Sequence, residues 1–188
     1  MELGQVLGAL PPIVDPNVLV GAASRDDAAV YRIALDRALV ATAIKRGLCP
    51  PGLELEAIRV MTTLNRAASE EMLAAGVTAC TDVTGYGLIG HLANLKGGAD
   101  LYAEKIPFMD GVRDLAERDL FPSGSRRNYE AYRDQVDWAE LPEVMRMMLC
   151  DAQTSGGLLV AIPPARAAGF KHPQIGVMRD DGKLRVVS

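Results

Sequence analysis

The segment TACTDVTGYGLIGHL, from Thr78 to Leu92, limits the possible folds of this chain more than any other stretch. Residues 77–84, VTACTDVT, have the composition of a strand, and GYG at 85–87 predicts a tight turn. The residues from Gly87 predict a helix that ends at Gly97 and Gly98. Glycine lets a backbone turn tightly and approach a ligand closely. The segment therefore predicts a strand, a ligand-accessible turn and a helix in succession.

Strand-like and helix-like segments alternate along the rest of the chain, which predicts a mixed α/β class. Residues 35–52 begin like a strand and end like a helix. The other expected elements are strands at 28–33, 99–108 and 158–162, helices at 53–75, 111–121 and 141–152, a basic loop at 122–132, and a closing hairpin at 174–188 that turns at Asp181 and Gly182.

The net charge and the composition argue against nucleic-acid and membrane partners. The net charge of -4 on 188 residues argues against nucleic-acid binding, which requires a basic face, although a local basic site remains allowed. No apolar run approaches the roughly 18 residues that span a bilayer, and MELGQVLGALPP lacks the features of a signal peptide. We therefore expect a cytoplasmic protein with no membrane or nucleic-acid partner. Three separated cysteines predict reduced thiols, and two histidines cannot form a histidine-rich metal centre.

Asp82 stands directly before the glycines at 85, 87 and 90. A carboxylate repels phosphate unless a cation lies between them, so Asp82 is a candidate Mg²⁺ ligand beside a phosphate-binding turn formed by Thr84, Gly85 and Gly87. The plainer interpretation, that Asp82 only caps the turn, stays open. A dinucleotide-binding fold, with Glu104 as the ribose acid, is a further alternative, which the polar preceding strand disfavours.

Three further motifs carry candidate site residues. SRDDAAVY places two adjacent acids at the entrance of a strand, where Asp27 joins Asp82 as a metal ligand if the two meet in space. DAQTSGGLLVAI offers hydroxyls and flexible amides for an anion, and SGSRRNY offers an arginine suited to oxyanions. Solvated turns and loops are the plain alternatives. The anion and substrate candidates are Ser125, Arg127, Asn128, Thr154, Ser155, Gly156 and Gly157.

Taken together, TDVTGYGLIGHL, the RRNY loop and DAQTSGGLLVAI resemble the C-terminal half of the selenophosphate synthetase (selenide, water dikinase) family. DPNVLVGAASRDDAAVY resembles the start of that family's ATP-binding half. The wider aminoimidazole ribonucleotide synthetase-like proteins share the TDVTGxG and TSGG elements. The resemblance implies an α/β fold, a mixed sheet with packed helices: a remnant of the N-terminal ATP-binding domain at 1–42 and a synthetase-like C-terminal domain at 43–188.

The resemblance also implies ATP-dependent phosphorylation of selenide to selenophosphate, with AMP and phosphate released and Mg²⁺ bridging acids to the nucleotide. Carried over by position, Asp27 and Asp82 match the metal ligands, and Ser24, Arg25 and Asp26 fall in the nucleotide-contacting segment. ATP and selenide are the expected substrates, and dimerisation is a further expectation from exposed strand edges.

The chain departs from this family at two places. It has no match to the glycine-rich segment with the catalytic cysteine or selenocysteine and its lysine, so no catalytic residue is carried over. Residues 39–43 join two segments that the family separates by most of its first domain. Two functional classes stay open: a synthetase with impaired activity, or a non-catalytic module that binds nucleotide, metal or a partner.

Overall fold

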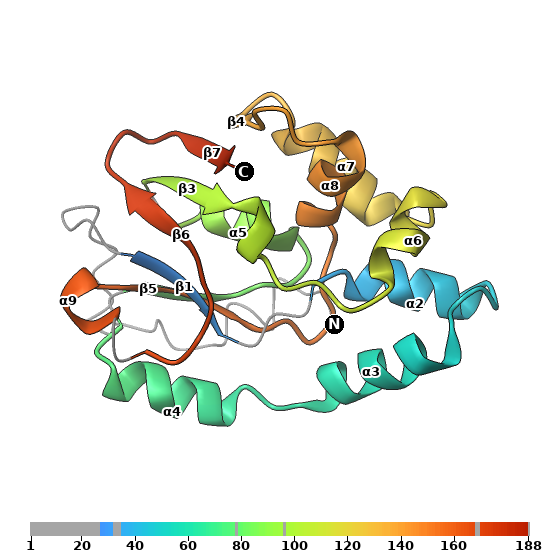
Figure 1. Ribbon diagram of the computed structural model, residues 1–188, viewed down its shortest axis with the longest axis horizontal. Helices are drawn as coiled ribbons and strands as arrows, with labels where there is room; N and C mark the ends of the chain where they lie inside the picture. The colour runs from blue at the N-terminus through green and yellow to red at the C-terminus, as the bar shows by residue number, and fades with distance from the viewer. Residues whose placement is uncertain (1–26, 32–34, 78, 96, 168–169, 188) are drawn as a thin grey trace, which may run out of the picture.

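The computed structural model describes residues 27–31, 35–77, 79–95, 97–167 and 170–187. Within them, seven strands form one mixed sheet in the order β2-β5-β1-β6-β3-β7-β4 (Figure 1). The strands are β1 (Asp27–Tyr31), β2 (Ala79–Asp82), β3 (Gly98–Tyr102), β4 (Val136–Asp137), β5 (Leu158–Ile162), β6 (Gln174–Arg179) and β7 (Leu184–Val187).

Neighbouring strands are antiparallel from β2 to β3, and β7 pairs in parallel with both β3 and β4. β5 lies between β2 and β1, with Asp82 opposite Leu158 on one side and Asp27 opposite Ile162 on the other. A dinucleotide-binding fold would place the strand before the glycine turn in a parallel sheet. Because β2 is an edge strand antiparallel to β5, that alternative is wrong for this chain.

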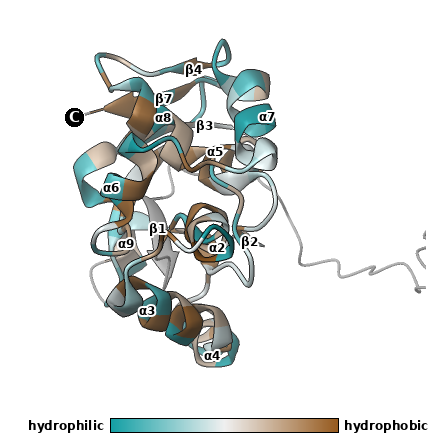
Figure 2. Cartoon of the chain, turned by 90° about the vertical axis from the view of Figure 1, so that its right-hand side faces the viewer, coloured by the Kyte–Doolittle hydropathy of each residue, from teal (hydrophilic) through white to brown (hydrophobic). Residues whose placement is uncertain are grey.

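Helices gather at one end and along one side of the sheet (Figure 1). In both ribbon views α3 and α4 lie at the end opposite α7 and α8 (Figures 1 and 2). The helices are α2 (Arg37–Lys45), α3 (Pro51–Thr62), α4 (Arg66–Ala74), α5 (Gly87–Ala93), the short 3-10 helix η1 (Ala103–Lys105), α6 (Val112–Glu117), α7 (Ser123–Tyr132), α8 (Glu143–Leu149) and α9 (Pro164–Ala167). In the described part of the chain no helix is both long and apolar enough to cross a bilayer.

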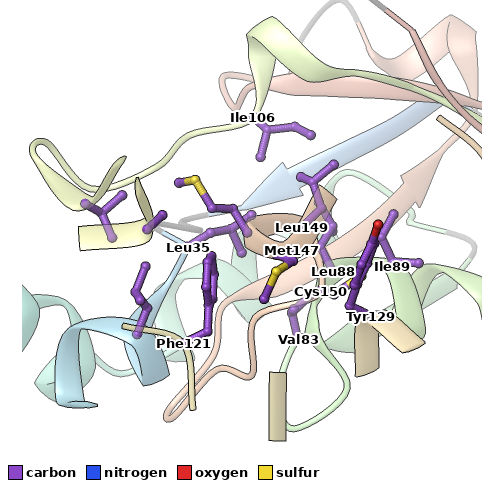
Figure 3. Close-up of a cluster of buried hydrophobic side chains, with 14 of the residues drawn as sticks. Leu35, Val83, Leu88, Ile89, Ile106, Phe121, Tyr129, Met147, Leu149 and Cys150 are labelled. Atoms are coloured by element: carbon purple, nitrogen blue, oxygen red, sulfur yellow. The ribbon is translucent and has the colours of Figure 1, made fainter. Parts of the chain in front are cut away.

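β5 has apolar residues throughout because both of its faces are covered. Leu159 belongs to the main core, which Figure 3 shows joining Val83 and Leu88 to Met147 and Leu149 of α8. Val160 and Ile162 face the other way and pack against a smaller cluster that includes Met72, Ala75, Val77, Ala167 and Phe170. β5 thus packs against both apolar clusters of the fold.

The helix expected over residues 53–75 is instead two helices, α3 and α4, separated at Thr63–Asn65. Two apolar residues that stand at helical spacing in this stretch face solvent, because Leu64 is 78% exposed and Ile58 is 48% exposed. Leu53, Ala57 and Ala68 are the buried residues of these helices. Hydrophobic colouring on α3 and α4 in Figure 2 therefore includes side chains that solvent reaches.

Two other expectations need correction. Residues 122–132, expected as a basic loop, form α7, which begins after Pro122 and buries Ser125 and Tyr129 on one face. The closing hairpin is also wrong: β6 and β7 do not pair with each other, because β3 lies between them. The turn at Asp181 and Gly182 connects strands that share a neighbour.

The mixed sheet with packed helices confirms the expected α/β fold class. The division at residue 42 stays a prediction, and so does dimerisation. β1 lies inside the sheet between β5 and β6, and α2 runs across position 42.

Leu159→Ala should lower the free energy of unfolding by about 3 kcal/mol, because it leaves a cavity where β5 meets the main core. Leu55→Ala is the matched control, since Leu55 is 69% exposed, and it should change stability by no more than about 0.5 kcal/mol. Urea unfolding of both variants measures this. Equal losses would show that β5 is not the centre of the core.

Candidate functional site

The turn after β2 and the loop before β5 are joined backbone to backbone. The Val83 N–H donates to Gly157 O at 2.8 Å, and the Gln153 N–H donates to Thr84 O at 2.9 Å. The first bond extends the pairing of Asp82 with Leu158 at the ends of β2 and β5, and the second adds a contact from the loop to the turn. The structure therefore brings the TDVTG and TSGG motifs, some 70 residues apart in sequence, into one surface.

The glycines of this surface do different work. A Cβ on Gly156 would lie 1.4 Å from Val83 O, and one on Gly87, which has φ +69°, would lie 2.6 Å from the Cys150 carbonyl carbon. Both glycines are buried and allow close backbone packing. Gly85 is exposed, and a Cβ there would meet nothing within 4 Å. Of these three glycines, Gly85 alone has open space for a ligand.

Asp82 ends the edge strand β2 with its residue exposed, on the same face as Cys80. In the described chain, the amides of Gly85 and Tyr86 donate to no protein acceptor, and both residues are exposed. The Gly87 amide instead donates to Thr84 O at 3.1 Å, and the Thr84 amide donates to His91 Nε2 at 3.0 Å. The amides of Thr84 and Gly87 are thus used in internal hydrogen bonds, and the expected role of these two residues in phosphate binding stays a prediction. The Asp82 carboxylate and the amides of Gly85 and Tyr86 are the groups open to a ligand.

α7 holds this turn from the opposite side. The Asn128 carboxamide donates to Gly85 O at 2.8 Å and to Cys150 O at 3.0 Å. Ser125 is fully buried, donates to Asp151 Oδ1 at 2.5 Å, and accepts from the Ala152 amide. These two residues link α7 to the glycine turn and the loop, and their expected anion contacts stay a prediction. Arg127, next to Asn128, is exposed.

Arg37 on α2 was not singled out by the sequence, yet it fixes the loop before β5. It is buried, its backbone amide donates to Gln153 Oε1 at 3.2 Å, and its guanidinium donates to Thr154 O at 3.1 Å. Thr154 and Ser155 themselves are exposed, and Ser155 has φ +54°. Their hydroxyls thus lie on the accessible side of a loop whose backbone is held from within.

A buried acid pair, Asp36 and Asp151, lies behind the loop. Asp151 accepts from the Leu39 amide at 3.1 Å and so satisfies the start of α2. Burial raises its pKa to about 7, against the opposing effect of the Ser125 and backbone hydrogen bonds. Burial and the Asp151 charge raise the pKa of Asp36, whose two carboxyl oxygens have no hydrogen-bond partner within the described residues. Sequence inspection gave no sign of this pair beyond an aspartate at the head of the DAQTSGG motif.

The expected metal pair, Asp27 and Asp82, is not brought together. Their backbones pair with Ile162 and Leu158, at opposite ends of β5. Four residues along a strand and two strand spacings separate them by roughly 16 Å, which is more than two aspartate side chains can bridge through one ion. Residues 24, 25 and 26 (Ser24, Arg25 and Asp26), expected to contact nucleotide, lie outside the described residues.

Thiol chemistry and a protein-only metal cage both lack support in the described part of the chain. Burial raises the pKa of Cys150 to about 12, and it raises that of Cys80 to about 11 although the residue as a whole is exposed, with neighbouring aspartates adding to both shifts. Thiols of this kind stay protonated at neutral pH. No group of three or more histidine, cysteine, aspartate or glutamate residues that could hold a metal occurs among the described residues.

The family described as AIR synthase related protein, C-terminal domain, matches residues 38–187. The chain belongs to this family. The family match spans the glycine turn, α7 and the loop before β5, and it begins one residue after Arg37.

Curated relatives of this AIR synthase related chain are named selenide, water dikinase, which confirms the expected resemblance. The protein from Myxococcus xanthus is 45% identical over 141 residues, covering 71% of this chain and 40% of its own length. The protein from Carboxydothermus hydrogenoformans is 40% identical over 128 residues, covering 66% of this chain and 37% of its own. The chain thus spans about two fifths of the length of these relatives.

A solved structure with a similar fold is the hydrogenase maturation protein HypE in complex with ATP. Its TM-score is 0.56 at 15% identity, and the match covers 87% of this chain and 48% of HypE. At that identity the likeness shows the fold alone, and it supports an AIR synthase-like arrangement.

Gly156→Ala in this AIR synthase related domain should lower the free energy of unfolding by about 3 kcal/mol, because its Cβ would overlap the Val83 carbonyl. Gly85→Ala, in open space on the same surface, should change it by less than about 1 kcal/mol. Chemical denaturation compares them. A Gly156→Ala variant as stable as the parent would contradict the close packing of turn and loop.

The acid pair predicts a pH dependence of stability. Because the folded-state pKa of Asp151 lies near 7, above its ordinary 3.8, the folded protein keeps a proton that the unfolded chain has lost. The free energy of unfolding should therefore fall as pH rises from about 4 to about 7, by up to roughly 1.4 kcal/mol per pH unit. Asp36→Asn should flatten this slope, because it removes a second buried carboxyl group whose pKa is raised by burial and by the Asp151 charge, whereas exposed Asp110→Asn should keep the slope. Urea unfolding across that pH range measures the slopes, and parallel slopes for the parent and Asp36→Asn would refute the contribution of Asp36.

Proposed function

We propose that this chain supplies the phosphate- and metal-facing surface of a selenide, water dikinase. In that reaction ATP phosphorylates selenide to selenophosphate, and AMP and phosphate are released. Two observations support the proposal: relatives named selenide, water dikinase at 40% to 45% identity, and the junction of the TDVTG turn with the TSGG loop. The junction carries most of the argument, because it gathers an acid, open amides and hydroxyls on one rigid surface.

The donor set at this surface fits a magnesium nucleotide. Magnesium usually keeps several waters and takes one or two carboxylates together with substrate phosphates, so one exposed carboxylate, Asp82, is an adequate protein contribution. The amides of Gly85 and Tyr86 suit phosphate oxygens, and the Thr154 and Ser155 hydroxyls add further donors. When bound, the ion neutralises phosphate charge. Asp27 is not part of this ligand set, because the strand register holds it at the far end of β5.

The residues of this chain would act by positioning. Phosphoryl transfer depends mainly on alignment and on charge stabilisation. Gln153 and Asn128 hold the backbones of the turn and the loop, while Arg37 fixes Thr154 from inside. Exposed Arg127, next to Asn128, offers a cation to an oxyanion at the rim. In the proposed reaction selenide is the nucleophile that attacks phosphorus.

A second candidate function is nucleotide and metal binding without catalysis. The separation of Asp27 from Asp82 favours it, because a triphosphate needs more compensating charge than one carboxylate-bound ion supplies. The two candidates share the binding surface and differ in turnover.

Asp82→Asn should weaken magnesium-dependent ATP binding by about tenfold or more, because it removes the carboxylate that holds the ion, while stability stays within about 1 kcal/mol. Titration calorimetry with ATP, with and without Mg²⁺, measures the effect. Asp110→Asn, another exposed aspartate, is the control and should bind like the parent. Equal affinities for parent and Asp82→Asn would remove Asp82 from the site.

An assay of AMP release by the unmodified protein distinguishes the two functions. Incubation with Mg²⁺, ATP and selenide should release AMP above the rate without selenide if the chain is a dikinase. Binding of Mg²⁺ and ATP without AMP release would favour the non-catalytic function. No binding at all would reject both.

A further inference from the structure

His91 lies at the centre of the hydrogen bonds that surround Asp82. It is 8% exposed on α5, nine residues after Asp82. The Thr84 amide donates to its Nε2 at 3.0 Å, and Thr84 Oγ1 lies 3.2 Å from the same nitrogen. On the other side of the ring, Nδ1 lies 3.3 Å from Thr81 Oγ1. One imidazole therefore bridges the residues on both sides of Asp82.

The direction of these bonds fixes the form of the ring. A backbone amide can only donate, so Nε2 accepts and carries no hydrogen. In a neutral imidazole the hydrogen is then on Nδ1, which donates to Thr81 Oγ1. The Thr81 hydroxyl is 3.2 Å from Asp82 O and donates to it. Each group in the chain from Thr84 to His91 to Thr81 to Asp82 therefore has one consistent role.

The surroundings of the ring favour the neutral form. Burial lowers the pKa of His91, and the Asp82 charge opposes that effect without outweighing it. The Tyr86 ring covers one side, with centroids 5.9 Å apart. This hydrogen-bond network also reaches the loop before β5, because Thr84 O accepts a hydrogen bond from the Gln153 amide.

We propose that His91, as the neutral Nδ1–H tautomer, is a positioning residue that sets the backbone from Thr81 to Thr84 so that Asp82 and the Gly85 amide face one ligand. This role rests on the proposed magnesium nucleotide site and goes beyond it, because His91 touches no ligand. It acts through the two threonines, and its loss should weaken binding while the sheet and core persist.

Nitrogen NMR of the imidazoles tests the tautomer in the unmodified protein. The chain has two histidines, and His172, which is 2.8 Å from Glu71, serves as the internal reference. At neutral pH, His91 should show an unprotonated Nε2 and a protonated Nδ1. An Nε2–H tautomer, or a doubly protonated ring at neutral pH, would overturn the proposal.

Variants test the consequence for binding. His91→Leu removes both bonds and should speed hydrogen exchange at the Thr84 amide and raise the dissociation constant for Mg²⁺ and ATP by about tenfold. His91→Gln places an acceptor near the position of Nε2 and should recover much of both losses. His172→Gln should behave like the parent.

The outcomes separate this proposal from the proposed function. A folded His91→Leu protein with parent-like Thr84 exchange and affinity would refute the role of His91. If the parent itself binds no Mg²⁺ and ATP, the proposed function fails, and the exchange of the Thr84 amide then decides whether His91 braces the turn. If His91→Leu does not fold, the proposal is tested by two other results: the His91 tautomer in the parent, and the Thr84 amide exchange and ligand affinity of His91→Gln.

Discussion

The candidate site depends on two backbone hydrogen bonds, from the Val83 amide to Gly157 and from the Gln153 amide to Thr84. The first continues the antiparallel pairing of β2 with β5 beyond the ends of the strands, and the second ties the loop before β5 to the turn. Because β5 is held in the sheet on both edges and packed on both faces, the position of the surface is fixed by a buried strand. The close contact between the turn and the loop requires glycine at position 156, because a side chain there would overlap the Val83 carbonyl.

Burial separates the polar groups of this surface into those that hold the structure and those that a ligand can reach. Polar groups that lose water need protein partners, and Ser125, Asn128 and the Thr84 amide all have them. Exposed Asp82, Thr154 and Ser155 remain in contact with water, which a ligand can replace. The motifs that resemble selenide, water dikinases therefore contain both structural residues and residues able to meet a substrate, and burial distinguishes the two kinds. Asp36, buried without a hydrogen-bond partner among described residues, is the costly exception that links stability to pH.

Sequence reasoning succeeded where a local pattern has one physical meaning. The uniformly apolar LLVAI matches β5 to the residue, and the glycine turn with its following helix is where the sequence places it. It failed where long-range contacts decide. Nothing local in residues 53–75 shows the break at Thr63–Asn65, and the spacing of Arg, Asn and Tyr residues in α7 resembles a loop because only one face of that helix is buried. Likewise, two runs flanking Asp181 and Gly182 look like a hairpin until β3 enters between them.

The site was predicted in part for the same reason. Asp82 and the TSGG loop were found as motifs, and the structure brings them together. The pairing of Asp27 with Asp82 depended on sheet register, which no single motif encodes, and β5 separates them. Arg37 and His91 were missed as site residues because their roles arise from partners that only the fold supplies.

The central claim is that the turn and the loop form one binding surface, and amide chemical-shift mapping during titration with Mg²⁺ and ATP tests it most directly. The account predicts that the largest shifts cluster at residues 82–86 and 153–157, with little change at β1 and α3. Shifts centred on another part of the chain, or confined to only one of the two segments, would contradict it.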